Sequence, residues 1–378
     1  MAGERYHRLL ANAGSATLDL SRELTSLSLE VELGRPSELS VRLPDPYRVL
    51  GHALQEGVEL ELELGTLDDH PLVFRGTVYA TSASLPEGST PSLRLVAYDA
   101  LMRLGIRRRS RAWTGRTLGA IAKEIAGEHG LQGVDLQLET DPTWSGDGVR
   151  QRDETDLALL LRLASDNGAE LWVSSDDQGD TLHIASRAAL WQADPALTMV
   201  YGRLGAKTPL GSFEAESWTA GRGRDRILAG MLGPSGEAIR ATTTPALEPD
   251  TEDPFLVEAL ARLHLERPKV ASPIEQLAAA APLARAALEG RLGLADPETL
   301  PGLEDSLAPA QARAANLSAP RGMGMQASGR ASGQTPLTSA QVVRVLGVGG
   351  RFSGDWLVTR ARRTLEGGNN ILEFRCVR

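Results

Sequence analysis

The residues best suited to catalysis do not form a recognisable catalytic motif in this sequence. The six histidines are scattered along the chain, at His7, His52, His70, His129, His183 and His264. No two of them have the i,i+4 spacing, with glutamate between, that places two imidazoles on one helix face to bind zinc. The G-x-S-x-G turn that exposes the nucleophile of α/β hydrolases is also absent. His183 falls in a predicted strand, so we interpret it as a structural histidine.

Two further patterns resemble reactive sites but favour other roles. Residues 349–354 (GGRFSG) have the spaced glycines of a phosphate loop, yet Asp355 follows instead of the lysine that holds phosphate. This segment therefore indicates a tight β turn. Asp153, Glu154 and Asp156 could suggest the paired carboxylates of glycoside hydrolysis. They stand at the predicted start of a helix, where acids cap free N–H groups and complement the helix dipole, so we interpret them as capping residues.

Composition narrows the classes of function further. Aspartate and glutamate number 49 against 40 lysines and arginines, and only 4% of residues are aromatic. Nucleic-acid binders gain affinity by neutralising phosphates and by stacking bases on aromatic rings, so no specific nucleic-acid partner is expected. A single cysteine, Cys376, excludes an intramolecular disulfide. Without an apolar signal-peptide core or a run of ~20 apolar residues, we expect a soluble protein assembled in the cytoplasm, with no membrane insertion.

Hydrophobic periodicity predicts a β unit at the start of the chain. Residues 58–64 (VELELEL) alternate between apolar and acidic side chains, which is typical of a strand with one buried and one solvated face. Strands are also predicted over 74–81 and 92–98, with a turn between them. Several short strands separated by turns indicate a small barrel or sandwich over about the first hundred residues.

The middle of the chain changes to helical spacing. Apolar residues predict one helix from about Leu118 to a C-cap at Gly130, and a second through 157–164 that Gly168 ends. Asp153 or Thr155 can provide the N-cap of the second helix. A hairpin over 171–184 follows, so residues 106–190 are predicted to form a compact α+β unit.

The last part returns to strands around a long interruption. Strand-like segments are predicted over 212–220, 226–232, 239–243, 341–348, 355–362 and 371–377. Asp253 and Pro254 are a good N-cap and first-turn pair for a helix that Pro268 ends. Ser272 then opens an alanine-rich helix that Pro282 should kink or break. Residues of about 245–327 are therefore predicted to be a helical and loop insertion.

The strongest charge feature is a basic run between the first two predicted units, comprising Arg107, Arg108, Arg109 and Arg111. One interpretation is a solvated linker, and the other is contact with an acidic neighbour or with DNA passing nearby. Residues 320–378 carry nine arginines against three acids, whereas residues 248–310 carry twelve acids against five bases. Such asymmetry favours complementary contacts between subunits. We take the four arginines as a candidate partner interface.

Two segments resemble one protein family. Residues 151–173 (QRDETDLALLLRLASDNGAELWV) are similar to the Q-x-x-E-S/T-D-L-x-F-L-x-R-L-A…G segment of the phage late-control protein D family and related contractile-system tail hubs. Residues 347–359 (GVGGRFSGDWLVT) resemble the GVG-x-x-FSG-x-Y-x-V segment of the same family. Trp356 replaces the common tyrosine, and Arg363 stands where a histidine is usual. With looser matches over most of 70–190 and 335–378, the resemblance covers about half of the chain.

The resemblance implies a mainly β fold built from three domains. Two tube-protein-like β-barrel domains, 1–105 and 191–378, would flank a small α+β domain at 106–190, and the helical insertion would interrupt the second barrel. It implies a structural baseplate hub of a contractile phage tail or injection system, a homotrimeric pseudo-sixfold adaptor between inner tube and spike, with no cofactor. Because the chain ends soon after the second barrel, the expected partners are a separate spike protein, inner-tube or tube-initiator proteins and baseplate components.

Two other classes of function stay open. One is a cell-wall-degrading enzyme of the tail tip, since hubs and lysozyme-like domains often occur together in tails. The other is a β-rich envelope- or glycan-binding module, against which the low aromatic content argues. The sequence does not distinguish a phage tail from another contractile injection particle.

Overall fold

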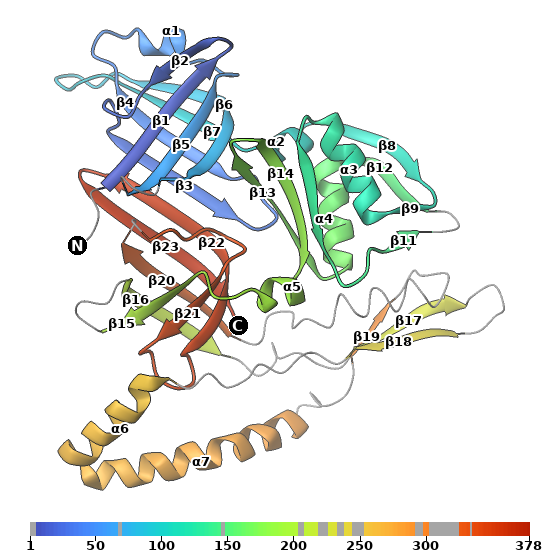
Figure 1. The fold of residues 1–378 in the computed structure, drawn as a ribbon, viewed down its shortest axis with the longest axis vertical. Coiled ribbons are helices and arrows are strands. Elements are labelled where there is room, and N and C mark those ends of the chain that lie inside the picture. The colour runs from blue at the N-terminus through green and yellow to red at the C-terminus, as the bar shows by residue number, and fades with distance from the viewer. Residues whose placement is uncertain are drawn as a thin grey trace.

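The structure is a computed structural model in which two rolled β units lie one above the other, with a mixed unit beside the upper one and a helical arm below (Figure 1). It describes residues 5–66, 70–144, 148–202, 208–217, 226–232, 238–243, 253–291, 298–301, 325–332 and 335–378. Mainly β architecture follows from this arrangement, and the predicted fold class is confirmed.

The first barrel comprises seven strands and one short helix: β1 (Arg5–Ala13), β2 (Ala16–Asp19), β3 (Ser26–Glu32), β4 (Glu38–Pro44), α1 (Leu50–Ala53), β5 (Glu59–Thr66), β6 (Leu72–Ser84) and β7 (Ser92–Tyr98). The strands pair antiparallel in the order β2-β1-β5-β6-β7-β4-β3. The strand predicted over 58–64 is confirmed as β5, because Leu60 and Leu62 are buried in the core. Between them, Glu61 faces outward and pairs with Arg75 of β6 at 2.9 Å.

The middle unit alternates short strands and helices: α2 (Leu101–Leu104), β8 (Arg108–Trp113), β9 (Arg116–Thr117), α3 (Leu118–Glu128), β10 (Gly133–Gln137), β11 (Thr143–Trp144), β12 (Val149–Thr155), α4 (Asp156–Asp166), β13 (Ala169–Asp176), β14 (Gly179–Ser186) and α5 (Arg187–Gln192). Both predicted helices and the β13–β14 hairpin are confirmed. Buried leucines and isoleucines of α3 and α4 share one core with the sheet of order β10-β14-β13. Of the two predicted caps, Thr155 is the one used, since its Oγ1 accepts from Ala158 N at 3.1 Å.

The second barrel uses strands from two distant parts of the chain: β15 (Leu197–Tyr201), β16 (Pro209–Ser217), β20 (Met325–Ser332), β21 (Val342–Leu346), β22 (Gly354–Glu366) and β23 (Asn369–Val377). The order β22-β21-β15-β16-β20-β23 closes on itself, because β23 also pairs with β22. Trp356 of β22 is fully buried in this barrel, where its ring meets Phe213 edge-on at 5.4 Å.

Direct strand pairing joins the two barrels. β22 pairs antiparallel with β3, so that Arg360 lies opposite Glu32 and Arg362 lies opposite Glu30. The Arg360 guanidinium also reaches Glu30 at 2.7 Å. Part of the arginine excess of the last 59 residues is therefore neutralised by the first barrel of the same chain, and the two barrels form one continuous sheet.

Between Ser217 and Met325 the described chain lies outside the barrel. It forms a separate sheet of β17 (Arg226–Leu232), β18 (Ala238–Thr243) and β19 (Glu298–Pro301), and two helices, α6 (Pro254–Glu266) and α7 (Pro268–Arg291). α6 agrees with the prediction and is capped by Asp253. The predicted start of the second helix at Ser272 is wrong: α7 begins at Pro268, since a proline is compatible with the first turn. Of the predicted kink or break at Pro282, the break is wrong, because α7 continues through Pro282 to Arg291.

Asp99 ties the first barrel to the middle unit. Its Oδ2 accepts from Ser37 N at 2.9 Å and its Oδ1 accepts from Leu101 N, at the start of α2, at 3.0 Å. Burial raises the pKa of Asp99 to about 6, against the lowering effect of these hydrogen bonds.

We predict that Asp99 titrates near pH 6 in the folded protein. Because an unfolded aspartate has a pKa of about 3.9, the folded state holds this proton more tightly. The contribution of Asp99 to stability therefore declines as pH rises from about 4 to 6 and stays constant above that range. Carbon-13 NMR of aspartate-labelled protein should detect one carboxyl resonance with this midpoint. Asp99→Asn should remove it and Asp177→Asn should not; a spectrum in which no aspartate titrates above pH 5 would contradict the prediction.

Candidate interaction site

Strand β8 carries three of the four arginines of the predicted partner interface. β8 pairs antiparallel with β12, and Trp113 lies opposite Val149 while Arg111 lies opposite Gln151. Because side chains alternate along a strand, Arg109 and Arg111 point to the same face as the buried Trp113, and Arg108 points to the other. The basic run is thus a strand with two chemically different faces.

The inward face of β8 is neutralised by acids of the two helices. Arg111 Nη1 donates to Glu128 Oε1 at 2.8 Å and its Nη2 donates to Asp156 Oδ1 at 2.5 Å. Its guanidinium also lies over the Trp113 ring, 4.7 Å from the centroid. Arg109 donates to Glu128, and its Nε lies 3.6 Å from Asp156. These two arginines therefore stabilise the packing of α3 and α4 on β8.

Asp156 is the centre of this network and is fully buried. Besides Arg111, Gln151 Nε2 donates to its Oδ1 at 2.8 Å, and His129 Nε2 lies 2.9 Å from its Oδ2. Burial alone would raise the pKa of Asp156, but the hydrogen bonds from His129 and Gln151 and the charge of Arg111 hold it below its ordinary value. The capping role predicted for Asp156 is therefore wrong, because its carboxylate faces the interior while Thr155 caps α4.

Arg107 and Arg108 lie on the exposed side of the same segment. Arg108 Nη1 donates to the backbone oxygen of Asp153 at 2.8 Å, and its side chain stays 67% exposed. Ile106, just before them, is 56% exposed. Of the four predicted interface arginines, Arg107 and Arg108 are thus exposed, while Arg109 and Arg111 pair with acids of the core-facing network, and the interface itself stays a prediction.

Glu128, His129 and Asp156 also place three possible metal-ligand atoms within 4.8 Å of one another. Both carboxylates already accept from Arg111, and Arg109 adds a second guanidinium. Two positive charges at this position repel a divalent cation, so the cluster is better suited to holding helices together than to binding metal.

His183 lies within a second polar group, on the face of β13 and β14 opposite the helices. Its Nε2 is 2.7 Å from Ser174 Oγ and its Nδ1 is 3.0 Å from Asp135 Oδ2. Its ring stacks on Trp172, with the planes 7° apart. The predicted structural role agrees with these contacts. The three side chains are nevertheless connected as in serine hydrolases, with the histidine between the serine and the aspartate. The sequence could not indicate this arrangement, because Asp135 and His183 are 48 positions apart.

The turn before β22 holds the helical arm to the second barrel. Ser353 Oγ donates to Asp253 Oδ2 at 2.6 Å, and both side chains are buried. Asp253 Oδ1 accepts from Phe255 N at 2.9 Å, which caps α6. A Cβ on Gly350 would lie 2.8 Å from Leu256 Cδ2, so glycine permits this close approach. The GGRFSG segment is therefore a turn, as predicted, and the structure shows in addition that it anchors α6.

Comparison with known proteins then decides the family. A profile described as phage tail baseplate hub (GPD) matches residues 30–230, more than half of the chain. The chain belongs to this family. The resemblance carried by residues 151–173 is thereby confirmed, and the protein is a structural component of a tail baseplate. No curated protein matches the chain.

Solved structures with the fold of this hub include two tail proteins. The tail protein from Neisseria meningitidis has a TM-score of 0.62 at 15% identity, with 98% of this chain and 96% of that chain covered. The 43 kDa tail protein of prophage MuSo2 from Shewanella oneidensis has a TM-score of 0.61 at 15% identity, covering 99% and 98%. An E. coli component of the type VI secretion system has a TM-score of 0.55 at 10% identity, covering 94% and 73%.

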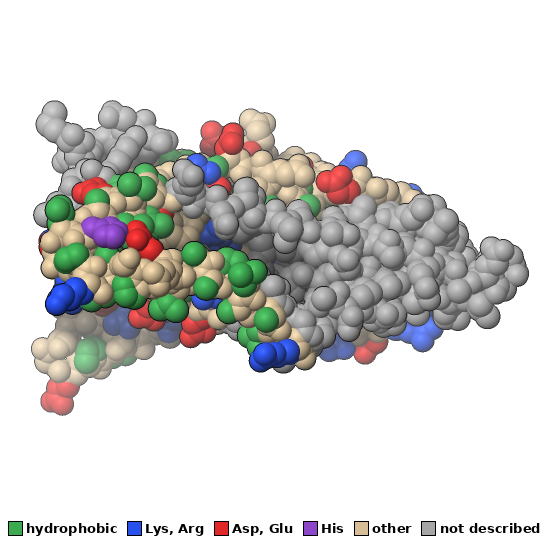
Figure 2. All heavy atoms as spheres, turned by 90° about the horizontal axis from the view of Figure 1, so that it is seen from below, with side chains coloured by type: hydrophobic (Ala, Val, Ile, Leu, Met, Phe, Trp, Pro, Cys, Tyr) green, Lys and Arg blue, Asp and Glu red, His purple; other side chains and the backbone are tan. Residues whose placement is uncertain are grey.

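The helical arm gives the hub an apolar surface. Figure 2 shows apolar side chains gathered over the part of the molecule that carries α6 and α7. On α7, Val270, Ile274 and Leu277 follow one helix face and are 46%, 41% and 72% exposed. Large exposed apolar patches mark interaction sites, so this face is a second candidate for contact with another subunit. Within the described residues, no helix combines the length and hydropathy needed to cross a membrane.

Proposed function

We propose that the hub acts as a homotrimer that adapts a sixfold inner tube to a threefold spike. The observation that supports this proposal most is the pairing of β3 with β22, which joins the two barrels in one continuous sheet. Three such chains around a threefold axis would present six barrels in a ring. A ring of this kind matches sixfold symmetry on one side and threefold symmetry on the other.

The expected partners are a spike protein, inner-tube or tube-initiator proteins and baseplate components. A chain of a Francisella PdpA–VgrG complex supports this, with a TM-score of 0.53 at 7% identity over 98% of this chain and 58% of that chain. The E. coli structure adds support, since it is described as similar to the T4 tail proteins gp27 and gp5. We propose further that the hub assembles in the cytoplasm and works without cofactor or catalytic turnover.

The predicted domain division, 1–105, 106–190 and 191–378, is part of this proposal. The hydrophobic cores of the first barrel, the middle unit and the second barrel support a division into three units. The core of the middle unit includes Ala100, Leu101 and Leu104, which places α2 with the middle unit and moves the first boundary to about residue 99. The helices and the small β17–β18–β19 sheet would then be an arm of the second barrel, available for contacts outside the ring.

Purified hub should therefore be a trimer. Mass photometry of the hub alone should give a species of about 120 kDa, against 40.4 kDa for a single chain. With spike protein added, the species should be heavier than this by the mass of the bound spike. If addition of both spike and tube protein leaves only the single chain, the trimeric adaptor is excluded.

Arg107 and Arg108 are proposed to contact an acidic neighbour in the baseplate. Replacing both with glutamate should weaken capture of that neighbour at least tenfold, because two attractions become two repulsions. Stability should change by less than about 0.5 kcal/mol, since both side chains are exposed. The matched control is Arg22→Glu, another exposed arginine, which should leave capture unchanged. Pull-down of particle proteins by tagged hub measures this, and equal capture by both variants would count against the interface.

Among the described residues, the hydrogen-bonded group of Ser174, His183 and Asp135 favours a hydrolase instead. A fluorophosphonate probe, which labels activated serines, distinguishes the two functions. The hub proposal predicts no labelling of the purified protein. Labelling that disappears in Ser174→Ala would establish a reactive serine and support the enzyme alternative.

A further inference from the structure

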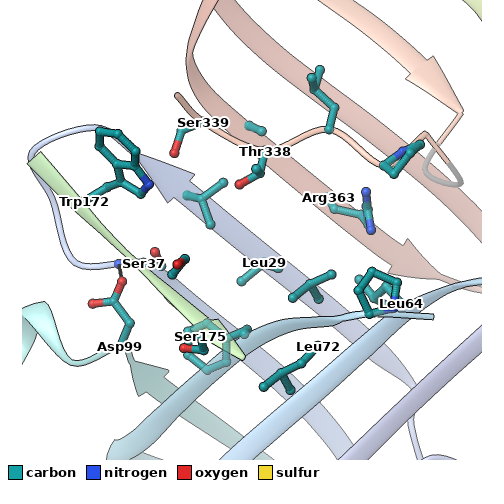
Figure 3. Close-up of a pocket in the computed structure, with 18 of the residues that line it drawn as sticks. Leu29, Ser37, Leu64, Leu72, Asp99, Trp172, Ser175, Thr338, Ser339 and Arg363 are labelled. Atoms are coloured by element: carbon teal, nitrogen blue, oxygen red, sulfur yellow. Dashed lines mark hydrogen bonds between the residues drawn. The ribbon is translucent and has the colours of Figure 1, made fainter. Parts of the chain in front are cut away.

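A cavity of about 340 Å³ lies where the first barrel, the middle unit and the second barrel meet. Its volume falls within the range of roughly 300–1,000 Å³ typical of small-molecule sites. Much of the lining is apolar and comes from all three units, including Leu29, Leu72, Trp172 and Leu337. In Figure 3, Arg363 lies close to Leu29 and Leu64, and Trp172 lies on the other side of the cavity.

Arg363 is the unusual member of this lining. It is 8% exposed, and its Nε is buried without a hydrogen-bond partner among the described residues. Its Nη2 donates to the backbone oxygen of Thr335 at 2.6 Å. Burial lowers the pKa of Arg363 to about 10, so the side chain remains charged at neutral pH. An uncompensated buried charge is costly, and a bound anion would offset that cost.

The other charged groups of the cavity already have partners. Asp99 accepts from two backbone N–H groups, and Glu32 pairs with Arg35 at 3.4 Å. Arg75 pairs with Glu61 at 2.9 Å. In the described part of the chain, no carboxylate lies within 4.0 Å of the Arg363 guanidinium. The cavity thus offers one unneutralised cation beside an apolar wall.

We propose that this cavity binds a small monocarboxylate with an apolar body. Arg363 would hold the carboxylate, because a guanidinium fork matches the two oxygens of that group. Leu29, Leu72 and Leu337 would cover the apolar body. A single cation matches one negative charge, which favours a carboxylate over a phosphate dianion. The site lies within one chain, so the proposal does not depend on the trimer.

Decanoate is a suitable probe, with 1-decanol and decyltrimethylammonium as uncharged and cationic analogues. Calorimetric titration of the purified full chain should detect one decanoate per chain, bound at least tenfold more tightly than either analogue. Arg363→Met should weaken decanoate binding at least tenfold and still fold, since replacing an unpaired buried arginine with an apolar side chain removes a penalty. Leu72→Trp, which fills the cavity and keeps Arg363, should also abolish binding. The control Arg116→Met, at an arginine 56% exposed, should bind as the parent does.

Absence of decanoate binding, or equal binding by Arg363→Met, would overturn the proposal. Native mass spectrometry provides an independent test. The parent should carry the added mass of a carboxylate acquired in the cell, and Arg363→Met should lack it.

Discussion

Replacement of Asp156 with alanine is expected to destabilise the middle unit by about 3–5 kcal/mol, the cost of removing one partner from a buried ion pair. The substitution leaves the guanidinium of Arg111 and the side chains of Gln151 and His129 facing an empty position. Because the chain has several units, hydrogen exchange of α3 and α4 measures this loss better than a single melting temperature.

The matched control for Asp156 is Glu154, two positions earlier. Glu154 pairs with Arg162 at the surface, at 2.6 Å, so Glu154→Ala should cost no more than about 1 kcal/mol.

The stability that Asp156 contributes should also depend on pH. Because its pKa is held low in the folded state, this contribution should be complete above about pH 4 and be lost as pH falls through the folded-state pKa. Equal protection of α4 in Asp156→Ala and Glu154→Ala would contradict this account of the network.

Replacement of Trp356 with alanine should cost the second barrel about 3–5 kcal/mol, as is usual for a large buried side chain. Trp356 is fully buried, its Nε1 donates to Phe352 O at 3.0 Å, and its ring packs edge-on against Phe213. The GGRFSG turn contains Phe352, so the loss should extend to the anchoring of α6. Chemical denaturation with hydrogen exchange over β21–β23 would measure both effects.

Two control substitutions test whether the loss of stability in Trp356→Ala comes from the buried ring. Trp356→Phe keeps most of the ring and loses the hydrogen bond, so about 1–2 kcal/mol is expected. Tyr47 is 83% exposed, and Tyr47→Ala should be within about 0.5 kcal/mol of the parent. Unchanged exchange of β21–β23 in Trp356→Ala would show that the barrel core is not organised around this residue.

Local sequence patterns were sufficient to predict a helix or strand where that element buries one face of regularly spaced apolar residues. β5 was predicted because its leucines alternate with glutamates, and α3 and α4 because their apolar residues recur at helical spacing. β8 was missed because its charged residues conceal the alternation that ends at Trp113. Reading Arg109, Arg111 and Trp113 as one face would have revealed the strand.

β20 was missed for a different reason. Its sequence, MQASGRAS, has the composition of a loop, but Ala327, Gly329 and Ala331 form a face that packs against the barrel core. A Cβ on Gly329 would lie 2.3 Å from Phe374 Cζ, so glycine is required beneath that ring.

The role of Asp156 could not be predicted from the sequence either. It depends on Arg111, 45 positions away, and no local pattern indicates such a contact.

The most direct test of the hub function is electron cryo-microscopy of the assembled particle that contains this chain. The account predicts three copies at the junction of inner tube and spike, with their six barrels in one ring and β3 paired with β22 in each copy. A map in which this chain is absent from that junction, or in which it is present as single copies bound to neither tube nor spike, would contradict it.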